Sequence, residues 1–186
     1  MTNFYVFIDV KSFGVKNAEA VTAIRSALEA YNQNILQEQC RIEDFCVVET
    51  NKRKNANVIV TLNKRKHKRM NLPKWVITPP IGLVYPLSYV SDKSIILDLE
   101  SIIQTALDYD KITSNIISEC VCRELCCFLG MSYRESEYRY GSKESQADFG
   151  LMLTPYSQYN IDLGKEYFLT DTEVDILKTA IAAKVA

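Results

Sequence analysis

The segment from Thr113 to Leu129 is the feature of this sequence that most restricts its fold. It is apolar nearly all round when drawn as a helix, and a helix of that kind has to be buried on most sides. Gly130 follows directly, and glycine in this position commonly ends a helix because it adopts the left-handed conformation at low cost. The sequence therefore predicts a long central helix with the other elements packed around it.

The remaining segments predict an α+β fold, in which a small mixed sheet packs on an N-terminal helix and on the central helix, with a C-terminal helix. Helical spacing of apolar residues indicates helices from Asn17 to about Leu36 and over Ser101–Tyr109. Thr170 and Glu173 form a capping box before a last helix, whose apolar face is Val174, Leu177 and Ile181. Runs rich in β-branched and aromatic residues predict strands at Phe4–Val10, Phe45–Val48, Asn57–Leu62 and Ser94–Leu99. Loops are expected at Leu72–Leu87, which is rich in proline, and at Met131–Gly164.

Length and composition are those of one globular domain over residues 1–186. With 47% hydrophobic and 24% charged residues, the chain resembles neither a disordered nor a fibrous protein. Nothing at the N-terminus is typical of a signal peptide, and no apolar run is long enough to cross a bilayer. Four of the six cysteines lie within residues 120–127, which is a poor spacing for disulfides. Reduced thiols, a cytoplasmic location and no membrane contact are expected.

The net charge of −1 hides an uneven distribution of charge along the chain. Residues 51–91 contain nine Lys or Arg and no acidic residue. Clustered positive charge of this kind, with aromatic residues nearby, can bind nucleic acid, so a nucleic-acid-binding protein using residues 52–69 is one alternative. A solvated loop or a lysine-guarded sheet edge is the preferred interpretation, and an acidic protein partner is about as plausible as nucleic acid. Within this stretch the residues expected to contact a partner are Lys64, Arg65, Lys66, Lys68 and Arg69.

The most informative motif is on the central helix, from Cys120 to Tyr133. Metzincin zinc proteases carry His-Glu-x-x-His-x-x-Gly-x-x-His, in which a helix places two histidines one turn apart and a glycine turn returns the third to the metal. The present sequence resembles this motif, with Glu124 at the general base and Gly130 at the turn. The three ligand positions fall on Arg123, Cys127 and Tyr133.

The resemblance extends along the chain in the order of its elements: helix, strands, an edge strand at Ser94–Leu99, the motif helix, loops and a closing helix at Phe168–Ile181. Met152, in Leu151–Pro155, stands in the place of the methionine that lies beneath the metal in metzincins. The motif is also similar to a bacterial family of zincin-like proteins in which the histidines are likewise lost from a Glu-Leu-x-x-x-Leu-Gly helix. The resemblance implies a zincin-like fold.

The ligand positions, however, predict no zinc centre, and no cofactor is expected. The chain contains one histidine, His67, which is not on the motif helix. Arg123 would repel a cation because its guanidinium is permanently charged, and without a metal no water is activated. The expected roles are structural: an ion pair between Arg123 and Glu119 one helical turn away, and a partly buried Glu124 satisfied by a nearby donor.

Two alternatives use the cysteines. A metal-dependent hydrolase would hold its ion with Cys127 together with Glu124, or with Cys127 together with Cys40 or Cys46. In the other alternative, a Cys127–His67 pair would act as a nucleophile. Small buried cysteines on an apolar helix are the preferred interpretation. The sequence therefore predicts a pseudo-metalloprotease that binds a protein partner or acts as a scaffold, with a subunit of a larger assembly as a further alternative. Its expected contact residues are the basic residues from Lys64 to Arg69 together with Tyr133 and Tyr138.

Overall fold

The computed structural model describes residues 1–63, 87–108, 110–132, 142, 144, 148, 150–152 and 169–185. Its strands are β1 (Thr2–Ile8), β2 (Phe45–Glu49), β3 (Val58–Leu62), β4 (Ser88–Ser91) and β5 (Ser94–Leu97). Its α-helices are α1 (Val10–Phe13), α2 (Ala18–Ala30), α3 (Leu99–Asp108), α4 (Thr113–Leu129) and α8 (Asp171–Val185). Short helices of other types are η1 (Val15–Asn17), the π-helical η2 (Tyr31–Gln39) and η3 (Arg53–Asn55).

The sheet has five strands in the order β2-β1-β3-β5-β4. The neighbours β2, β1, β3 and β5 run parallel, and only β4 is antiparallel to its neighbour β5. The prediction of a mixed α+β fold is confirmed. The prediction that Ser94–Leu99 is an edge strand is wrong, because β5 lies between β3 and β4 and the edge is β4. The side chains of Ile95 and Leu97 are fully buried there, as expected for an interior strand with a covered face.

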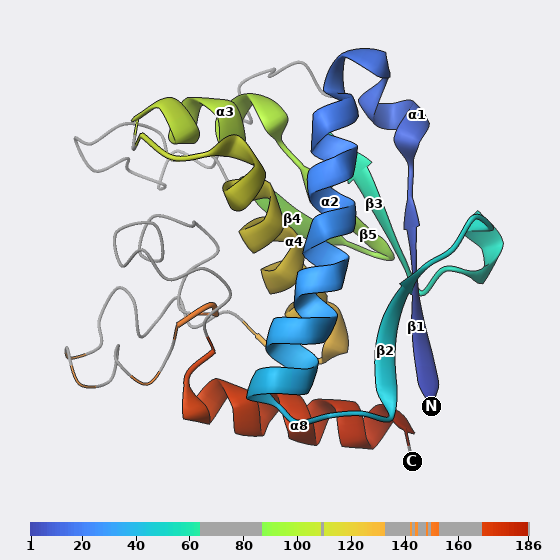
Figure 1. Ribbon diagram of the computed structural model, residues 1–186, viewed down its shortest axis with the longest axis vertical. Helices are drawn as coiled ribbons and strands as arrows, with labels where there is room; N and C mark the ends of the chain where they lie inside the picture. Colours follow the sequence, from blue (N-terminus) through green and yellow to red (C-terminus); the bar gives the residue numbers. More distant parts are fainter. Residues whose placement is uncertain are drawn as a thin grey trace, which may run out of the picture.

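Strand alternation gives the sheet two different faces. Its inner face carries buried side chains such as Val6, Val47, Val60 and Leu97, whereas the residues between them are only half-buried or exposed. Helix α2 contacts β2, and α4 contacts β4 and β5. Figure 1 shows α2 and α4 next to each other beside the sheet, with α8 running across their lower ends. The core therefore lies between the inner face and this helical layer.

Helices α2 and α4 pack closely against each other, and this packing explains why small residues, including cysteines, occupy several positions of α4. Small residues follow one another at intervals of four along both helices, which allows the backbones to approach closely. Three polar contacts mark the register: Ser118 Oγ to Ala23 O at 3.4 Å, Cys122 Sγ to Ala27 O at 3.7 Å, and Tyr31 Oη with Cys126 Sγ at 3.5 Å. The cysteines act here as small packing residues.

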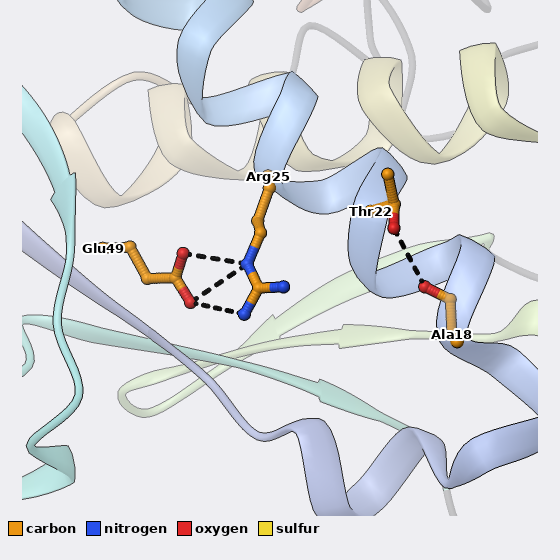
Figure 2. Close-up of polar contacts among 4 residues, drawn as sticks. All are labelled: Ala18, Thr22, Arg25 and Glu49. Atoms are coloured by element: carbon orange, nitrogen blue, oxygen red, sulfur yellow. Dashed lines mark hydrogen bonds and ion pairs between the residues drawn. The ribbon is translucent and has the colours of Figure 1, made fainter.

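The sheet edge at β2 is capped by one side chain from η2. Asn32 donates from Nδ2 to the carbonyl of Val47 at 2.8 Å, and its Oδ1 accepts from the Val47 amide at 2.9 Å. The amide thereby pairs with the backbone of an edge strand as another strand would. An ion pair also joins the helical layer to β2. Arg25 of α2 donates from Nε and Nη2 to the Glu49 carboxylate, as Figure 2 shows.

Helix ends follow the predicted signals. Gly130 caps α4 in the left-handed conformation at φ 113°, and a Cβ there would lie 3.3 Å from the Cβ of Ala180 on α8. The capping box is reciprocal, because Thr170 N donates to Glu173 Oε2 at 3.1 Å and Glu173 N donates to Thr170 Oγ1 at 3.3 Å. Both predictions are confirmed.

Some helices begin or end at other residues than the sequence predicted. The helix predicted from Asn17 to about Leu36 is present and continues as a π-helix to Gln39. Helix α3 begins at Leu99 rather than Ser101, because the Asp98 carboxylate caps it by accepting from the Ser101 amide at 3.0 Å. The predicted loops at Leu72–Leu87 and Met131–Gly164 fall mostly outside the described residues. Within the described part of the chain, no helix combines the length and apolar character of a membrane span.

Candidate functional site

The motif helix places its polar residues against the edge strand of the sheet. Arg123 and Glu124 are fully buried, and Glu119 and Ser88 are nearly so. Arg123 lies 3.7 Å from Glu119, measured from Nη1 to Oε1, so the predicted ion pair one helical turn apart is present. These residues form a polar cluster between α4 and β4, defined here as Ser88, Glu119, Cys120, Arg123 and Glu124.

Ser88 connects the arginine to the second carboxylate. Arg123 Nη2 donates to Ser88 Oγ at 3.3 Å, and the Ser88 hydroxyl donates to Glu124 Oε1 at 2.6 Å. The predicted role of Glu124, a carboxylate satisfied by a nearby donor, is confirmed, although its side chain is completely rather than partly buried. The guanidinium of Arg123 is thus paired with the Glu119 carboxylate and linked through Ser88 to the Glu124 carboxylate, and buried charges need partners of this kind.

Three of the four thiols on this helix, those of Cys120, Cys122 and Cys126, are poor nucleophiles and poor metal ligands. Burial raises the pKa of Cys120 to about 11, with the positive charge of Arg123 acting in the opposite direction. Burial also raises the pKa of Cys122 and of Cys126. A thiol must lose its proton to attack a carbon or bind zinc strongly, so these three side chains are protonated at neutral pH and serve packing.

The three cysteines predicted as metal ligands, Cys127, Cys40 and Cys46, lie in or directly after three different elements of the fold. Cys127 is half-buried and packs against the core, while Cys40 is buried near the far end of η2. Among the residues that the structure describes, no three His, Cys, Asp or Glu side chains are grouped closely enough to hold a metal ion. His67, Tyr133, Tyr138 and the basic residues Lys64, Arg65, Lys66, Lys68 and Arg69 lie outside the described residues.

Another buried acid, Glu173, holds the segment around Met152. Glu173 Oε1 accepts from the Met152 amide at 2.7 Å, while its other oxygen belongs to the capping box with Thr170. Met152 itself is buried. Burial raises the pKa of Glu173, and the backbone amides that it accepts from act in the opposite direction. The N-terminal end of α8 and residues 150–152 are therefore joined by one carboxylate.

Sequence reasoning identified Arg123, Glu124 and Glu119 but not their partner Ser88. Ser88 lies in a four-residue strand without a motif, and only the packing of β4 on α4 brings it to the cluster. The capping box identified Glu173 in the sequence, and one of its carboxylate oxygens is used there. Nothing in the neighbouring sequence indicated that the other oxygen accepts from the Met152 amide.

No protein-family model matches this sequence, and the search of curated proteins found no match.

Proposed function

We propose that this protein is a zincin-like pseudo-metalloprotease that works by binding another protein. The observation that carries the proposal is the buried guanidinium of Arg123 at the position of the first zinc ligand in the metzincin motif, held by Glu119 and Ser88. A permanent positive charge at that position opposes a metal ion, and the sequence has a single histidine elsewhere.

The arrangement of Glu124 supports the same conclusion. In a zinc protease the corresponding glutamate moves a proton between water and substrate, a task that requires access to both. Here the carboxylate is completely buried and accepts a short hydrogen bond from Ser88 of the edge strand. That contact suits a residue that fixes β4 to α4.

The element order and the ends of the helices are consistent with the zincin-like scaffold. A mostly parallel sheet ends in an antiparallel edge strand, the motif helix lies on its inner face, and a left-handed glycine ends that helix. Glu173 anchors Met152 beside the closing helix. A scaffold that has lost its metal ligands can still bind another protein, because a stable core holds the surface loops through which proteins commonly bind their partners.

The first test is the metal content of untagged protein purified under reducing conditions, measured by mass spectrometry. We expect far less than one equivalent of any transition metal. Zinc or iron near one equivalent, lost in Glu124→Gln or in Cys127→Ser, would overturn the proposal in favour of the hydrolase alternative.

The binding half of the proposal has its own test. Proteins cross-linked to the native chain in its source cells are identified, and their binding is then measured with purified components. Substitution of Tyr133 and Tyr138 by Ala, or of the basic residues from Lys64 to Arg69 by Ser, is expected to weaken that binding. Unchanged affinity in both variants would place the binding surface elsewhere.

A further inference from the structure

The outer face of the sheet, opposite α2 and α4, carries aromatic side chains that the core does not use. Tyr5 and Phe7 of β1 alternate with the buried Phe4, Val6 and Ile8, so both point away from the helical layer. Tyr5 is 38% exposed, and Asn3 donates from Nδ2 to its hydroxyl at 3.4 Å. In register, Tyr5 pairs with Val48 and Phe7 pairs with Ile59.

At the other end of the sheet the same face carries Tyr89, which pairs with Ile96. Both side chains are half-buried, and Ile96 alternates with the buried Ile95 and Leu97. Aromatic side chains thus lie on this face on the interior strand β1 and on the edge strand β4. Such rings give flat surfaces on which nucleic-acid bases stack, whatever the base.

The loop between β2 and β3 brings positive charge to the same side. Both ends of this loop are bonded to β1: Thr50 N donates to Val6 O, and Asn57 N donates to Tyr5 O, each at 2.8 Å. The parallel strands β2 and β3 lie on opposite sides of β1, so the loop crosses β1, and the right-handed rule puts that crossing on the face away from α2. Figure 1 shows α2 and this loop on opposite sides of β1.

The crossing loop is basic and contains no acidic residue. Lys52, Arg53 and Lys54 are all exposed, and Arg53 lies 3.9 Å from Asp9 at the end of β1. Lys93, in the turn between β4 and β5, is a further exposed cation. The exposed lysines of the crossing loop can hold the phosphates of a strand whose bases lie on the aromatic face.

We propose that the outer face binds single-stranded nucleic acid, with bases stacked on Tyr5 and phosphates held by Lys52 and Lys54. A single strand is favoured over a duplex because only unpaired bases offer their flat faces to the protein. An acidic protein would match the lysines but would make no specific use of the exposed tyrosine ring on the same face.

The test is fluorescence anisotropy of a labelled single-stranded oligonucleotide, with the matching duplex as competitor, over a range of salt concentrations. We expect the single strand to bind more tightly than the duplex. Tyr5→Leu should weaken binding about five- to a hundredfold, the range for one stacked base, whereas Tyr5→Phe should keep it. Lys52→Ala with Lys54→Ala should reduce the slope of log affinity against log salt by about 1.4, at roughly 0.7 per phosphate.

The matched control is Lys111→Ala with Lys184→Ala, which removes the same charge from exposed positions outside this face. The proposal is overturned if no oligonucleotide binds at low salt, if Tyr5→Leu binds as the native chain does, or if the control pair weakens binding as much as the loop pair. Circular dichroism shows that each variant is folded. The metal measurement above has no bearing on this result, so the two proposals can fail separately.

Discussion

Removing the charge of Arg123 tests the polar cluster directly. In Arg123→Met the Glu119 carboxylate loses a cation that lies 3.7 Å away in a nearly water-free environment. Two unit charges at that distance attract by about 4.5 kcal/mol at an effective dielectric constant of roughly 20. Breaking one side of a buried pair typically costs about 3–5 kcal/mol. We therefore expect the free energy of unfolding to fall by roughly that amount, a large part of the 5–15 kcal/mol typical of a domain.

Urea unfolding followed by circular dichroism measures the change, and a second substitution assigns it to the pair. In the Arg123→Met background, Glu119→Gln should restore at least about 1 kcal/mol, because coupled contacts differ from additivity by about 0.5–3 kcal/mol. Arg123→Lys keeps the positive charge without the planar donors. Its free energy of unfolding should lie between that of the native chain and that of Arg123→Met. If Arg123→Met lowers the free energy of unfolding by less than about 1 kcal/mol, or if Glu119→Gln restores nothing, the pair of Arg123 and Glu119 does not stabilise the core.

Three further predictions concern other parts of the fold. Gly130→Ala should destabilise the protein by about 1–2 kcal/mol, since its φ is 113° and its new Cβ contacts α8. Gly14→Ala, also at positive φ but with open space around it, should cost less when both variants are compared by thermal unfolding. Because the folded-state pKa of Glu173 is raised, its contribution to stability is full below the unfolded pKa of about 4.3 and is lost as pH rises through the folded pKa; Glu173→Gln should flatten that part of the stability–pH profile, and an unchanged profile would contradict the assignment. In native protein, a thiol reagent should react quickly with at most Cys46 and Cys127, and mass mapping that finds the buried thiols labelled at the same rate would count against the packing role.

The fold could be predicted from the sequence where local signals decide it. The limits of α4, its glycine end and the capping box of α8 all depend on residues within one helical turn of each other. The order of the strands could not be predicted in this way. Ser94–Leu97 is the same short apolar run whether it lies inside a sheet or at its edge, and pairing with β3 and β4 places it inside.

In the candidate site, too, local contacts could be predicted from the sequence and contacts between distant segments could not. The contact between Arg123 and Glu119 follows from the sequence, because residues four apart lie on one face of a helix. The sequence also shows that no zinc site with two or more histidines can form within one chain, since the chain has one histidine. The burial of Arg123, its link through Ser88 to Glu124 and the bond of Glu173 to Met152 are visible in the tertiary structure alone. These contacts join segments far apart in the chain, and the free energy that forms them comes from packing the sheet, α4 and α8 into one core.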